Sequence, residues 1–504
     1  MTRLLGIDVG TGGTRAVLLA ETGRVVSAAD AEHTPMSSPK IGWAEQDPQD
    51  WWRAACIAIK ECLAKGGVQS GAIDAIGVTG QMHGSVLLDA EGQVLRPAII
   101  WCDQRTEEQC REITRRVGAH RLIDLVANPA LTGFTLPKIL WVREHEPAIW
   151  ARVRTILLPK DYVRFRLTGV KATDVADASG TLLFDVVNRR WSAEMLKIFE
   201  IKAELLPKVL ESPEIASNVS KEGATATGLR EGIPVAAGAG DQAAGAVGMG
   251  IVAPGDVSAT IGTSGVVFAA TSKPILEPEG RIHTFCHAVP GRWHVMGVTQ
   301  GAGLSLRWFR DQFAVTQGNR KESYEELTKV AERTRAGSDG LLWAPYLMGE
   351  RTPHLDPNAR GALVGITAQH TRAHVIRAIL EGVAFSLRDT FALFSVLNVP
   401  VKSIRLGGGG ARSPLWQQIQ ADVYAMAVEL VAADEGGAYG AGLLAGVGIG
   451  VWPSVDEACK VAVHVAKRVQ PIGHNVELME RQYLEFRKIY PALSTVARAS
   501  GAAN

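Results

Sequence analysis

Two glycine-rich turns with matching sequences occupy corresponding places in the two halves of this chain. The first, VGTGG at 9–13, lies within the run LLGIDVGTGGTRAVLL at 4–19. The second, IGTSG at 261–265, lies within VSATIGTSGVVFAA at 257–270. Each turn separates two apolar runs of strand length, which is the pattern of a β-hairpin. Two such hairpins a domain length apart indicate a duplicated domain that faces itself across a cleft.

The chain length agrees with a division into domains, because 504 residues exceed what a single hydrophobic core organises. The two hairpins and the loop between them set the expected boundaries. We predict an N-terminal domain over 1–250, a C-terminal domain over 251–490 and a tail over 491–504.

Composition excludes several classes of protein. The formal net charge of +1 argues against a surface for nucleic acid or another polyanion. No apolar run reaches the length of a membrane span, and no signal-peptide pattern opens the chain. The six cysteines show neither CxxC nor metal-ligand spacing and are typical of reduced thiols. We therefore expect a cytoplasmic enzyme without a membrane or nucleic-acid partner.

The two hairpin turns are suited to binding anions, because a turn of glycine and threonine directs backbone N–H groups and hydroxyls outward. Asp8 ends the first strand, where its carboxylate could face a phosphate-bound Mg²⁺ directly or through water; the alternative is an ordinary turn aspartate. A third glycine-rich turn, IRLGGGGA at 404–411, precedes a helix that Ser413 caps and Pro414 begins. No GK[ST] follows any of these turns, so none is a Walker loop.

Asp241 stands alone among small residues in AGAGDQAAGAVGMG at 237–250. Glycine and alanine let backbone and ligand approach closely, and no opposite charge nearby in the sequence would hold the carboxylate. Asp241 could therefore accept a proton from a hydroxyl; alternatively, it caps the helix that follows.

Two further segments contain residues suited to binding a sugar. GQMHG at 80–84 ends a short buried strand, where α/β proteins place ligand contacts. There His83 could bind a hydroxyl and Met82 could pack on a carbon skeleton, although a buried core histidine is the alternative. WCDQR at 101–105 offers Trp101 and Asp103, which suit a polyol but equally an ordinary surface ion pair.

Other segments carry weaker signals. The helix predicted from 133 onward contains Lys138, which we expect in solvent or capping a neighbour, and we assign no chemistry to 157–169. HTFCHAVPGRWH at 283–294 holds three histidines, but no regularly placed carboxylate or cysteine accompanies them, so zinc is not favoured.

Taken together, two phosphate-binding hairpins and a third glycine-rich turn predict a nucleoside triphosphate held between two lobes. Without a P-loop lysine, backbone dipoles and Mg²⁺ must neutralise the phosphates. Asp241 would then accept the proton of an attacking sugar hydroxyl.

The chain resembles the FGGY carbohydrate kinases over about residues 3–490. The motifs that carry the resemblance are GIDVGTGGTR, EQDPQDWW, GQMHG, GFTLPKILWVREH, LLPKDY, GAGDQAAGAVG, IGTSGVVF, HTFCHAVPGRWH, PYLMGERTPH and GGGARSPLW. GFTLPKILWVREH and the segment at 361–381 are similar to the two signature patterns of the family. Within the family, GQMHG is typical of the members that phosphorylate D-xylulose.

The resemblance implies an α/β fold of two duplicated actin/hexokinase-like (ribonuclease H-like) ATPase domains, with the active site in the cleft between them. It implies ATP and Mg²⁺ as cofactors, phosphorylation of the 5-hydroxyl of D-xylulose, and a possible homodimer. Asp241 would be the general base and Asp8 would face Mg²⁺. The implied sugar contacts are Met82, His83, Asp241 and Gln242, with Trp101 and Asp103 as further candidates. At the position of Gln242, the members that phosphorylate D-xylulose commonly carry asparagine. The implied nucleotide contacts are Asp8, Thr11, Gly12, Gly13, Thr14, Arg15, Gly262, Thr263, Gly409, Gly410 and Ala411.

Two other functions remain open from the sequence, and the presence of Asp241 argues against a third. The substrate could be another ketose or polyol, such as ribulose, a deoxy-xylulose or an alditol. The chain could instead be an actin/Hsp70-like ATPase that drives partner binding, although such a protein has no use for GQMHG or for Asp241 among glycines. A catalytically silent sugar sensor would lack the base.

Overall fold

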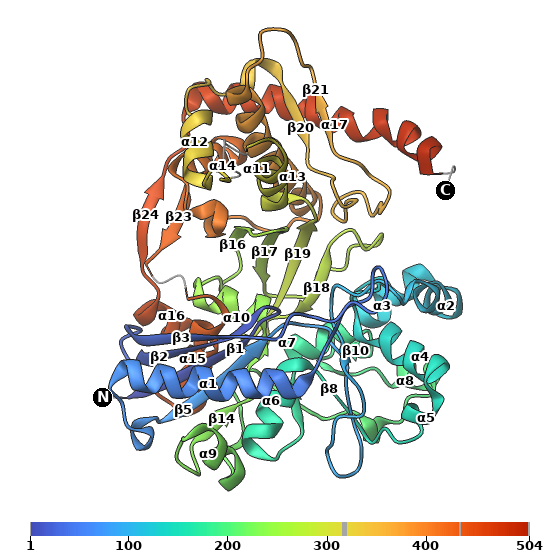
Figure 1. Cartoon of the computed structure of the whole chain (residues 1–504), viewed down its shortest axis with the longest axis vertical. Coiled ribbons are helices and arrows are strands. Elements are labelled where there is room, and N and C mark those ends of the chain that lie inside the picture. Colours follow the sequence, from blue (N-terminus) through green and yellow to red (C-terminus); the bar gives the residue numbers. More distant parts are fainter. Residues whose placement is uncertain (1, 315–319, 433–434, 502–504) are drawn as a thin grey trace.

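The structure is a computed structural model that describes residues 2–314, 320–432 and 435–501. It forms two lobes, each built on a seven-stranded sheet, stacked along the long axis of the molecule (Figure 1).

The sheet of the N-terminal lobe runs in the order β13-β14-β5-β1-β2-β3, with β15 also paired to β5. Strands β1 to β3 form an antiparallel meander, and β5 and β14 continue the sheet parallel to β1. Its strands are β1 (Arg3–Val9), β2 (Gly13–Ala20), β3 (Val25–Glu32), β5 (Ala75–Gly80), β13 (Ile215–Asn218), β14 (Pro234–Ala236) and β15 (Ala239–Gly240).

The sheet of the C-terminal lobe repeats this plan in the order β18-β19-β17-β16-β22-β23-β24. Strands β19, β17 and β16 form the antiparallel meander, and β22 and β23 follow in parallel. Its strands are β16 (Asp256–Ile261), β17 (Gly265–Thr271), β18 (His283–Cys286), β19 (Trp293–Thr299), β22 (Ser403–Gly408), β23 (Val428–Val431) and β24 (Val465–Val469). Both predicted hairpins, β1–β2 and β16–β17, are present, and the duplication extends to four strands around each, because β3, β5, β14 and β13 correspond to β19, β22, β23 and β24.

Alternation along β1 explains how the first sheet is covered on both faces. Leu5 and Ile7 point into a core with α1 (Pro48–Gly66) and α6 (Pro159–Thr168). On the other face, a Cβ placed on Gly6 would lie 1.8 Å from the carbonyl oxygen of Ala438, so only glycine permits this approach. The helix that approaches so closely is α15.

Helix α15 (Gly436–Gly448) therefore belongs spatially to the N-terminal lobe although it comes late in the chain. With α10 (Asp241–Gly248) and α16 (Val455–Ala462), it shares a core with Leu4 of the first sheet, and all three helices lie beside that lobe in Figure 1. The boundaries at 250 and 490 remain predictions, but the segment from α15 to α16 packs outside the C-terminal lobe.

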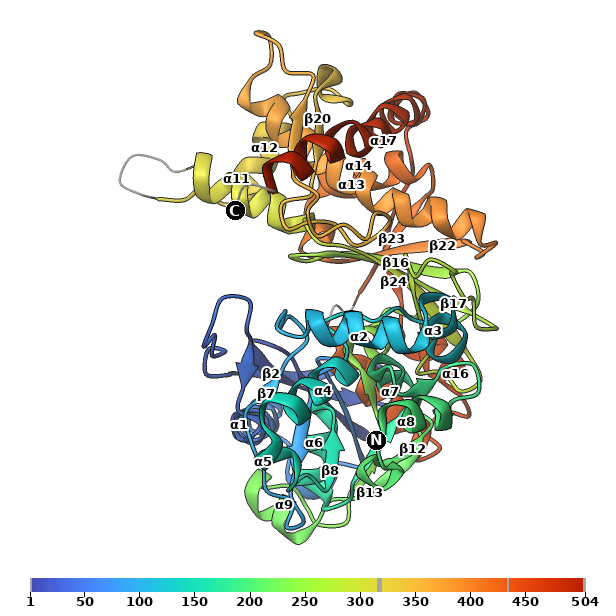
Figure 2. The ribbon, with the colours of Figure 1, turned by 90° about the vertical axis from the view of Figure 1, so that its right-hand side faces the viewer.

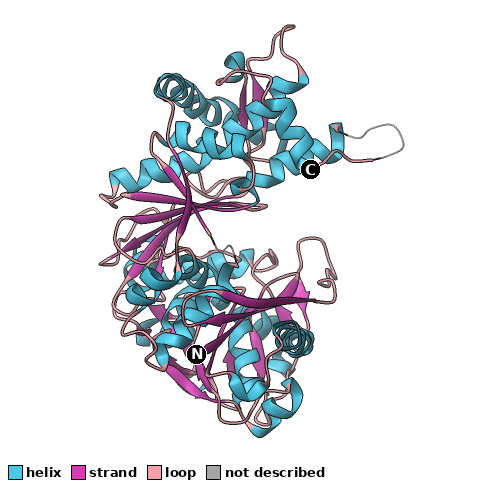
Figure 3. Ribbon diagram, turned by 90° about the vertical axis from the view of Figure 1, so that its left-hand side faces the viewer, coloured by secondary structure: helices cyan, strands magenta, loops and turns pink. Residues whose placement is uncertain are grey.

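One face of the second sheet packs on the helices of the C-terminal lobe, and the other turns toward the N-terminal lobe (Figure 3). Those helices are α11 (Ala302–Phe313), α12 (Tyr324–Ala331), α13 (Arg372–Val396), α14 (Pro414–Tyr424) and α17 (Gly473–Gly501). Helix α17 packs on this lobe and continues through most of the predicted 491–504 tail.

Smaller elements complete the N-terminal lobe, where α2, α3 and α4 cover one side in Figure 2. They are β4 (Glu45–Gln46), β6 (Val86–Leu88), β7 (Ala98–Ile99), α2 (Glu107–Val117), α3 (Ala119–Val126), α4 (Thr135–His145), α5 (Pro147–Trp150), β8 (Thr155–Leu157), β9 (Ala172–Asp174), α7 (Val175–Ala178), β10 (Phe184–Asp185), β11 (Arg190–Trp191), α8 (Ala193–Phe199), β12 (Lys208–Leu210) and α9 (Lys221–Thr227). The C-terminal lobe adds β20 (Leu342–Ala344) and β21 (Ala362–Val364). Among the helices of the described segments, none is both long and apolar enough to cross a membrane.

Candidate active site

The first glycine-rich turn is fixed by two glutamines that sequence reasoning did not single out. The amide of Gln46 donates to the carbonyl of Thr11 (2.7 Å), and that of Gln81 donates to Gly10 (3.3 Å) and to Gln46 (2.9 Å). Gln46 ends β4, and Gln81 follows β5 directly. In the sequence, both glutamines could have been recognised as polar residues at the end of a short buried strand.

The residues of this turn that we predict to bind phosphate differ in how freely they could contact a ligand. Gly12 is exposed, and a Cβ there would meet no other atom within 4 Å. The Thr11 hydroxyl accepts from the indole N–H of Trp101 (2.9 Å), which places this predicted sugar residue against the phosphate turn. Thr14 is buried, and its hydroxyl pairs with His33 (2.9 Å), so its side chain is not directed at a ligand.

Two predicted ligand residues are engaged in ion pairs. Asp103 is completely buried; it pairs with Arg105 at 2.7 Å and accepts from the backbone N–H of Ala44 at 2.6 Å. Arg15 binds Asp30 at 2.6 Å and also contacts Glu435. The carboxylate of Asp103 therefore has no free capacity for a sugar hydroxyl, which corrects its assignment to the sugar site. Arg15, whose side chain is 35% exposed, remains a predicted phosphate contact.

The second glycine-rich turn opens onto a pocket of about 760 Å³ in the C-terminal lobe. Gly262 closes the turn by donating to the carbonyl of Ser264 (2.9 Å), and the turn connects β16 to β17. The pocket volume is typical of sites for small organic ligands. Its lining residues are Ile261, Gly262, Thr263, Gly303, Leu306, Arg307, Tyr324, Glu325, Thr328, Lys329, Glu332, Gly409, Gly410, Arg412, Ser413, Pro414 and Trp416.

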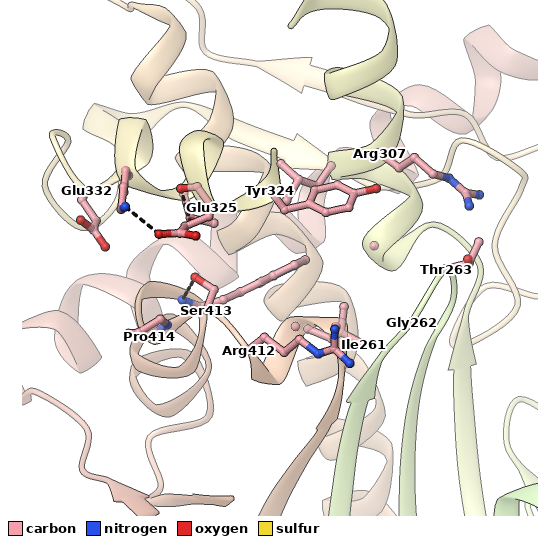
Figure 4. A pocket seen from close by; sticks show the side chains of 17 residues that line it. Ile261, Gly262, Thr263, Arg307, Tyr324, Glu325, Glu332, Arg412, Ser413 and Pro414 are labelled. Atoms are coloured by element: carbon pink, nitrogen blue, oxygen red, sulfur yellow. Dashed lines mark hydrogen bonds and ion pairs between the residues drawn. The ribbon is translucent and has the colours of Figure 1, made fainter. Parts of the chain in front are cut away.

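This pocket joins two of the predicted nucleotide segments (Figure 4). Gly262 and Thr263 border it from the hairpin, and Gly409 and Gly410 from the third glycine-rich turn, after which Ser413 caps α14 as predicted. Ala411 does not line the pocket; it is buried, and its carbonyl accepts from Gln417 at 2.7 Å. An apolar pocket that ends at a glycine-rich hairpin can hold a base and sugar with phosphates extending toward the turn.

Asp8 lies at the end of β1 with an unpartnered oxygen. Its Oδ1 is buried and has no hydrogen-bond partner within the described part of the chain. Burial raises the pKa of Asp8 to about 6, and the charge of Arg15, its neighbour across the hairpin, opposes that rise. Gly437 of α15 leaves room for the carboxylate, since a Cβ there would lie 3.0 Å from Oδ2. This arrangement can bind a cation.

Asp241 is the first residue of α10 and does not cap it; Gly240 occupies the N-cap position. The backbone that leads to Asp241 is held in place at Gly238. This residue has a left-handed φ of 79°, and a Cβ on it would lie 1.8 Å from the carbonyl oxygen of Val78, so only glycine fits there. Burial raises the pKa of Asp241 to about 7, and the negative charge of Asp8 adds to the rise, whereas hydrogen bonds from the backbone and side chain of Gln242 oppose it. Gln242 therefore contacts the carboxylate of Asp241, the residue before it. A carboxylate with this pKa is a competent base near neutral pH.

Met82 packs beside the loop that carries Asp241, and His83 follows it directly in the chain. A Cβ on Gly240 would come within 2.8 Å of Met82 Cγ, so Met82 packs directly against the residue that precedes Asp241. His83 has a left-handed φ of 70°, and its Nδ1 lies 2.7 Å from the carbonyl oxygen of Gly180. Because a carbonyl only accepts, Nδ1 carries the proton and Nε2 is left as an acceptor. Burial lowers the pKa of His83 to about 3, and the charges of Lys138 and Arg351 add to this effect, so the ring is neutral.

Lys138 is buried, contrary to the expectation of a solvent-exposed or capping side chain at a helix surface. Its ammonium donates to the carbonyl of His83 at 3.0 Å and also contacts that of Gly133. Burial lowers the pKa of Lys138 to about 7. The lysine therefore fixes the backbone of the residue that offers Nε2 to the site.

The three histidines of 283–294 are all buried in the interior. His283 Nδ1 lies 3.0 Å from Asn128 Oδ1, and His287 Nε2 lies 2.9 Å from the carbonyl oxygen of Ile251. His294 stacks on Phe268 with ring centroids 4.1 Å apart. These contacts are those of core side chains.

Comparisons with known proteins agree with this geometry. Residues 3–248 match the N-terminal domain of the FGGY family of carbohydrate kinases, and residues 257–449 match its C-terminal domain. The xylulose kinase of Bacillus subtilis (strain 168) is 40% identical over 490 residues, 97% of this chain and 97% of that protein. The crystal structure of xylulose kinase from Rhodospirillum rubrum has a TM-score of 0.90 at 30% identity, covering 98% of this chain and 100% of that one. Gluconate kinase from Lactobacillus acidophilus has a TM-score of 0.91 at 25% identity, with both chains fully covered. This chain belongs to the FGGY family of carbohydrate kinases.

Proposed function

We propose that this kinase transfers the γ-phosphoryl group of ATP to the 5-hydroxyl of D-xylulose, with Asp241 as general base. The observation that carries the proposal is the carboxylate of Asp241 at the start of α10, which does not cap the helix and whose pKa is raised to about 7 by burial and by the charge of Asp8. The similarity to xylulose kinases supports the choice of sugar.

The chemistry assigns a separate task to each group. Nε2 of His83 accepts a hydrogen bond from a sugar hydroxyl, and Met82 packs on the carbon chain. Asp241 takes the proton of the 5-hydroxyl as that oxygen bonds to the γ-phosphorus. The bond from phosphorus to the bridging oxygen breaks, and ADP leaves with its electron pair. Because phosphoryl transfer requires little covalent chemistry from the protein, alignment of the reactants and stabilisation of charge supply most of the rate enhancement.

Mg²⁺ is the cation we propose at Asp8. The unpartnered Oδ1 of Asp8 suits a hard cation that is held mostly by phosphates and water. When bound, Mg²⁺ would neutralise charge on the phosphates of ATP. The backbone N–H groups of the two glycine-rich turns would orient the same phosphates, and the pocket of the C-terminal lobe would hold the adenosine.

A substrate panel with coupled measurement of ADP release tests the sugar assignment. We expect kcat/KM for D-xylulose to exceed that for ribulose, a deoxy-xylulose, an alditol and gluconate by at least about tenfold, because each differs in the hydroxyls that His83 and Gln242 can meet. Equal turnover of several of these compounds would contradict the assignment to D-xylulose. Hydrolysis of ATP without any dependence on sugar would favour an actin/Hsp70-like ATPase.

The raised pKa of Asp241 predicts the pH dependence of the reaction. Only the ionised carboxylate accepts a proton, so kcat/KM for the sugar should rise with pH through about pH 7. Asp8, whose pKa is about 6, contributes to the same acid limb, and loss of the Lys138 proton near pH 7 works against a plateau above it. His83 adds no step in this range, since its lowered pKa keeps it neutral. Initial rates at limiting sugar and saturating ATP between pH 5 and 9 measure this profile, and activity that stays constant down to pH 5 would count against Asp241 as the base.

Replacing His83 should weaken the binding of the sugar far more than the binding of the nucleotide. We expect His83→Ala to raise the sugar KM by about tenfold with the ATP KM unchanged, because one hydrogen-bond acceptor is lost. His83→Asn is the matched control, because asparagine tolerates the left-handed φ and keeps an acceptor, and it should recover part of the affinity. Equal rises in both KM values would show that the whole site is disturbed.

We also place the reaction in the cytoplasm, which the free thiols of all six cysteines support. The homodimer remains a prediction.

A further inference from the structure

Five charged side chains lie buried behind the loop that carries Asp241, and the mechanism above uses none of them. Each has at most 1% of its surface exposed. Lys160 Nζ lies 2.6 Å from Asp161, 2.8 Å from Asp174 and 3.7 Å from Asp177, and Arg164 lies 3.1 Å from Asp161. We call these residues the Lys160 cluster.

The Lys160 cluster holds one carboxyl more than it holds cations. Lys160 and Arg164 can balance two carboxylates, and Asp161 and Asp174 make the short contacts. Asp177 has the longest contact with Lys160, and neither of its oxygens has a hydrogen-bond partner among the residues described. An ionised carboxylate in such a position is costly. Asp177 is therefore the carboxyl that retains a proton at neutral pH.

The electrostatics of the cluster agree with this assignment. Burial raises the pKa of both Asp174 and Asp177, and the rise is the larger for Asp177, where the negative charges of Asp161, Asp174 and Asp241 add to it against the opposing charge of Lys160. The pKa of Lys160 is also raised, because the three cluster aspartates outweigh burial. The groups on the neighbouring strands are Cys286 of β18, whose pKa is raised by burial to about 12, and Lys208 of β12, which is exposed.

The cluster contacts the catalytic loop directly. A Cβ on Gly240 would lie 3.3 Å from Asp177 Oδ1 and 2.8 Å from Met82 Cγ, so Asp177 and Met82 meet at the residue before Asp241. Arg164 donates to the carbonyl of Ala237 (2.5 Å) at the start of the same loop. Asp177 thus packs against the loop of the base at Gly240, the residue that Met82 also contacts.

We propose that Asp177 is a positioning residue for the transfer reaction: as the neutral third carboxyl of the Lys160 cluster, it packs against Gly240 beside Met82 without adding a further negative charge to those of Asp241 and Asp8. The proposal rests on the function proposed for Asp241. It differs from a purely structural role because it specifies the charge state of Asp177.

Two substitutions test the proposal. Asp177→Asn reproduces the shape of a protonated carboxyl, so we expect kcat/KM for the sugar within about twofold of the wild type and an unmoved acid limb of its pH profile. Asp177→Ala leaves a void behind Met82, so kcat/KM for the sugar should fall about tenfold or more while the ATP KM stays unchanged. Asp185→Asn, on β10 outside the cluster, is the control.

Either of two results would overturn the proposal. An acid limb that moves to lower pH by more than about half a unit in Asp177→Asn would mean that an ionised Asp177 had been raising the pKa of Asp241. Wild-type sugar kinetics in Asp177→Ala would mean that the carboxyl positions nothing. Failure of the proposed base is separately visible, because Asp241→Asn would then keep its activity and its acid limb whatever the Asp177 variants do.

Discussion

Asp241→Asn is expected to lose on the order of 10²–10⁴-fold of kcat. The substitution keeps the size of the side chain but removes the proton acceptor at the start of α10, so the sugar hydroxyl must attack with its proton still bound. Affinity for ATP should stay within about twofold, because the pocket for the nucleotide lies in the other lobe. Steady-state kinetics and nucleotide titration measure the two effects.

Asp124→Asn is the matched control for this loss. Asp124 is exposed on α3 and belongs to no part of the site, so kcat should not change. Turnover by Asp241→Asn close to that of the control would remove Asp241 from the mechanism. Loss of ATP affinity together with turnover would instead point to a misfolded site.

Gly440→Ala is expected to destabilise the protein by about 3 kcal/mol and to lower the apparent Tm by several degrees. A Cβ on Gly440 would lie 1.8 Å from the carbonyl oxygen of Ala244. Because this oxygen belongs to the backbone, the alanine could be accommodated only if helices α15 and α10 moved apart. Because Asp241 begins α10, activity should fall with stability. Thermal unfolding followed by circular dichroism measures the change.

Gly245→Ala provides the comparison within the same pair of helices. A Cβ on Gly245 of α10 would meet no other part of the protein within 4 Å, so alanine should leave the Tm unchanged or raise it slightly through its better helix propensity. If both variants unfold at the wild-type temperature, the close contact between α10 and α15 does not contribute to stability.

The sequence predicted those parts of the fold that depend on local chemistry. Glycine-rich turns between apolar runs specify hairpins, and both β1–β2 and β16–β17 form with matching sheets around them. The return of α15 to the first sheet could not be predicted in this way. Most of its residues are small. Tyr439, Leu443 and Val447 do recur on one face, but nothing local indicates which sheet that helix packs on, because its partners Gly6 and Ala244 lie far away in the sequence.

In the candidate site, too, features that depend on local sequence could be predicted, whereas contacts between distant segments could not. Asp241 among glycines and the turn at 262–263 were visible because small residues mark close approach. The burial of Lys138 and Lys160 was not, since a lysine becomes stable in the interior only through carbonyls and carboxylates supplied by distant segments. For Asp103, an adjacent acid and base in sequence suggested either a polyol contact or a surface pair, and the structure places the pair in the interior.

The central claim is that Asp241 receives the proton of the sugar hydroxyl that attacks ATP. A crystal structure with D-xylulose and a non-hydrolysable ATP analogue measures this most directly, through the distance from the Asp241 carboxylate to the 5-hydroxyl oxygen. We predict a hydrogen bond of about 2.6–3.2 Å, with the γ-phosphate between the turns at 10–13 and 262–264. A sugar bound with its 5-hydroxyl directed away from Asp241, or a nucleotide whose phosphates contact neither turn, would contradict the account.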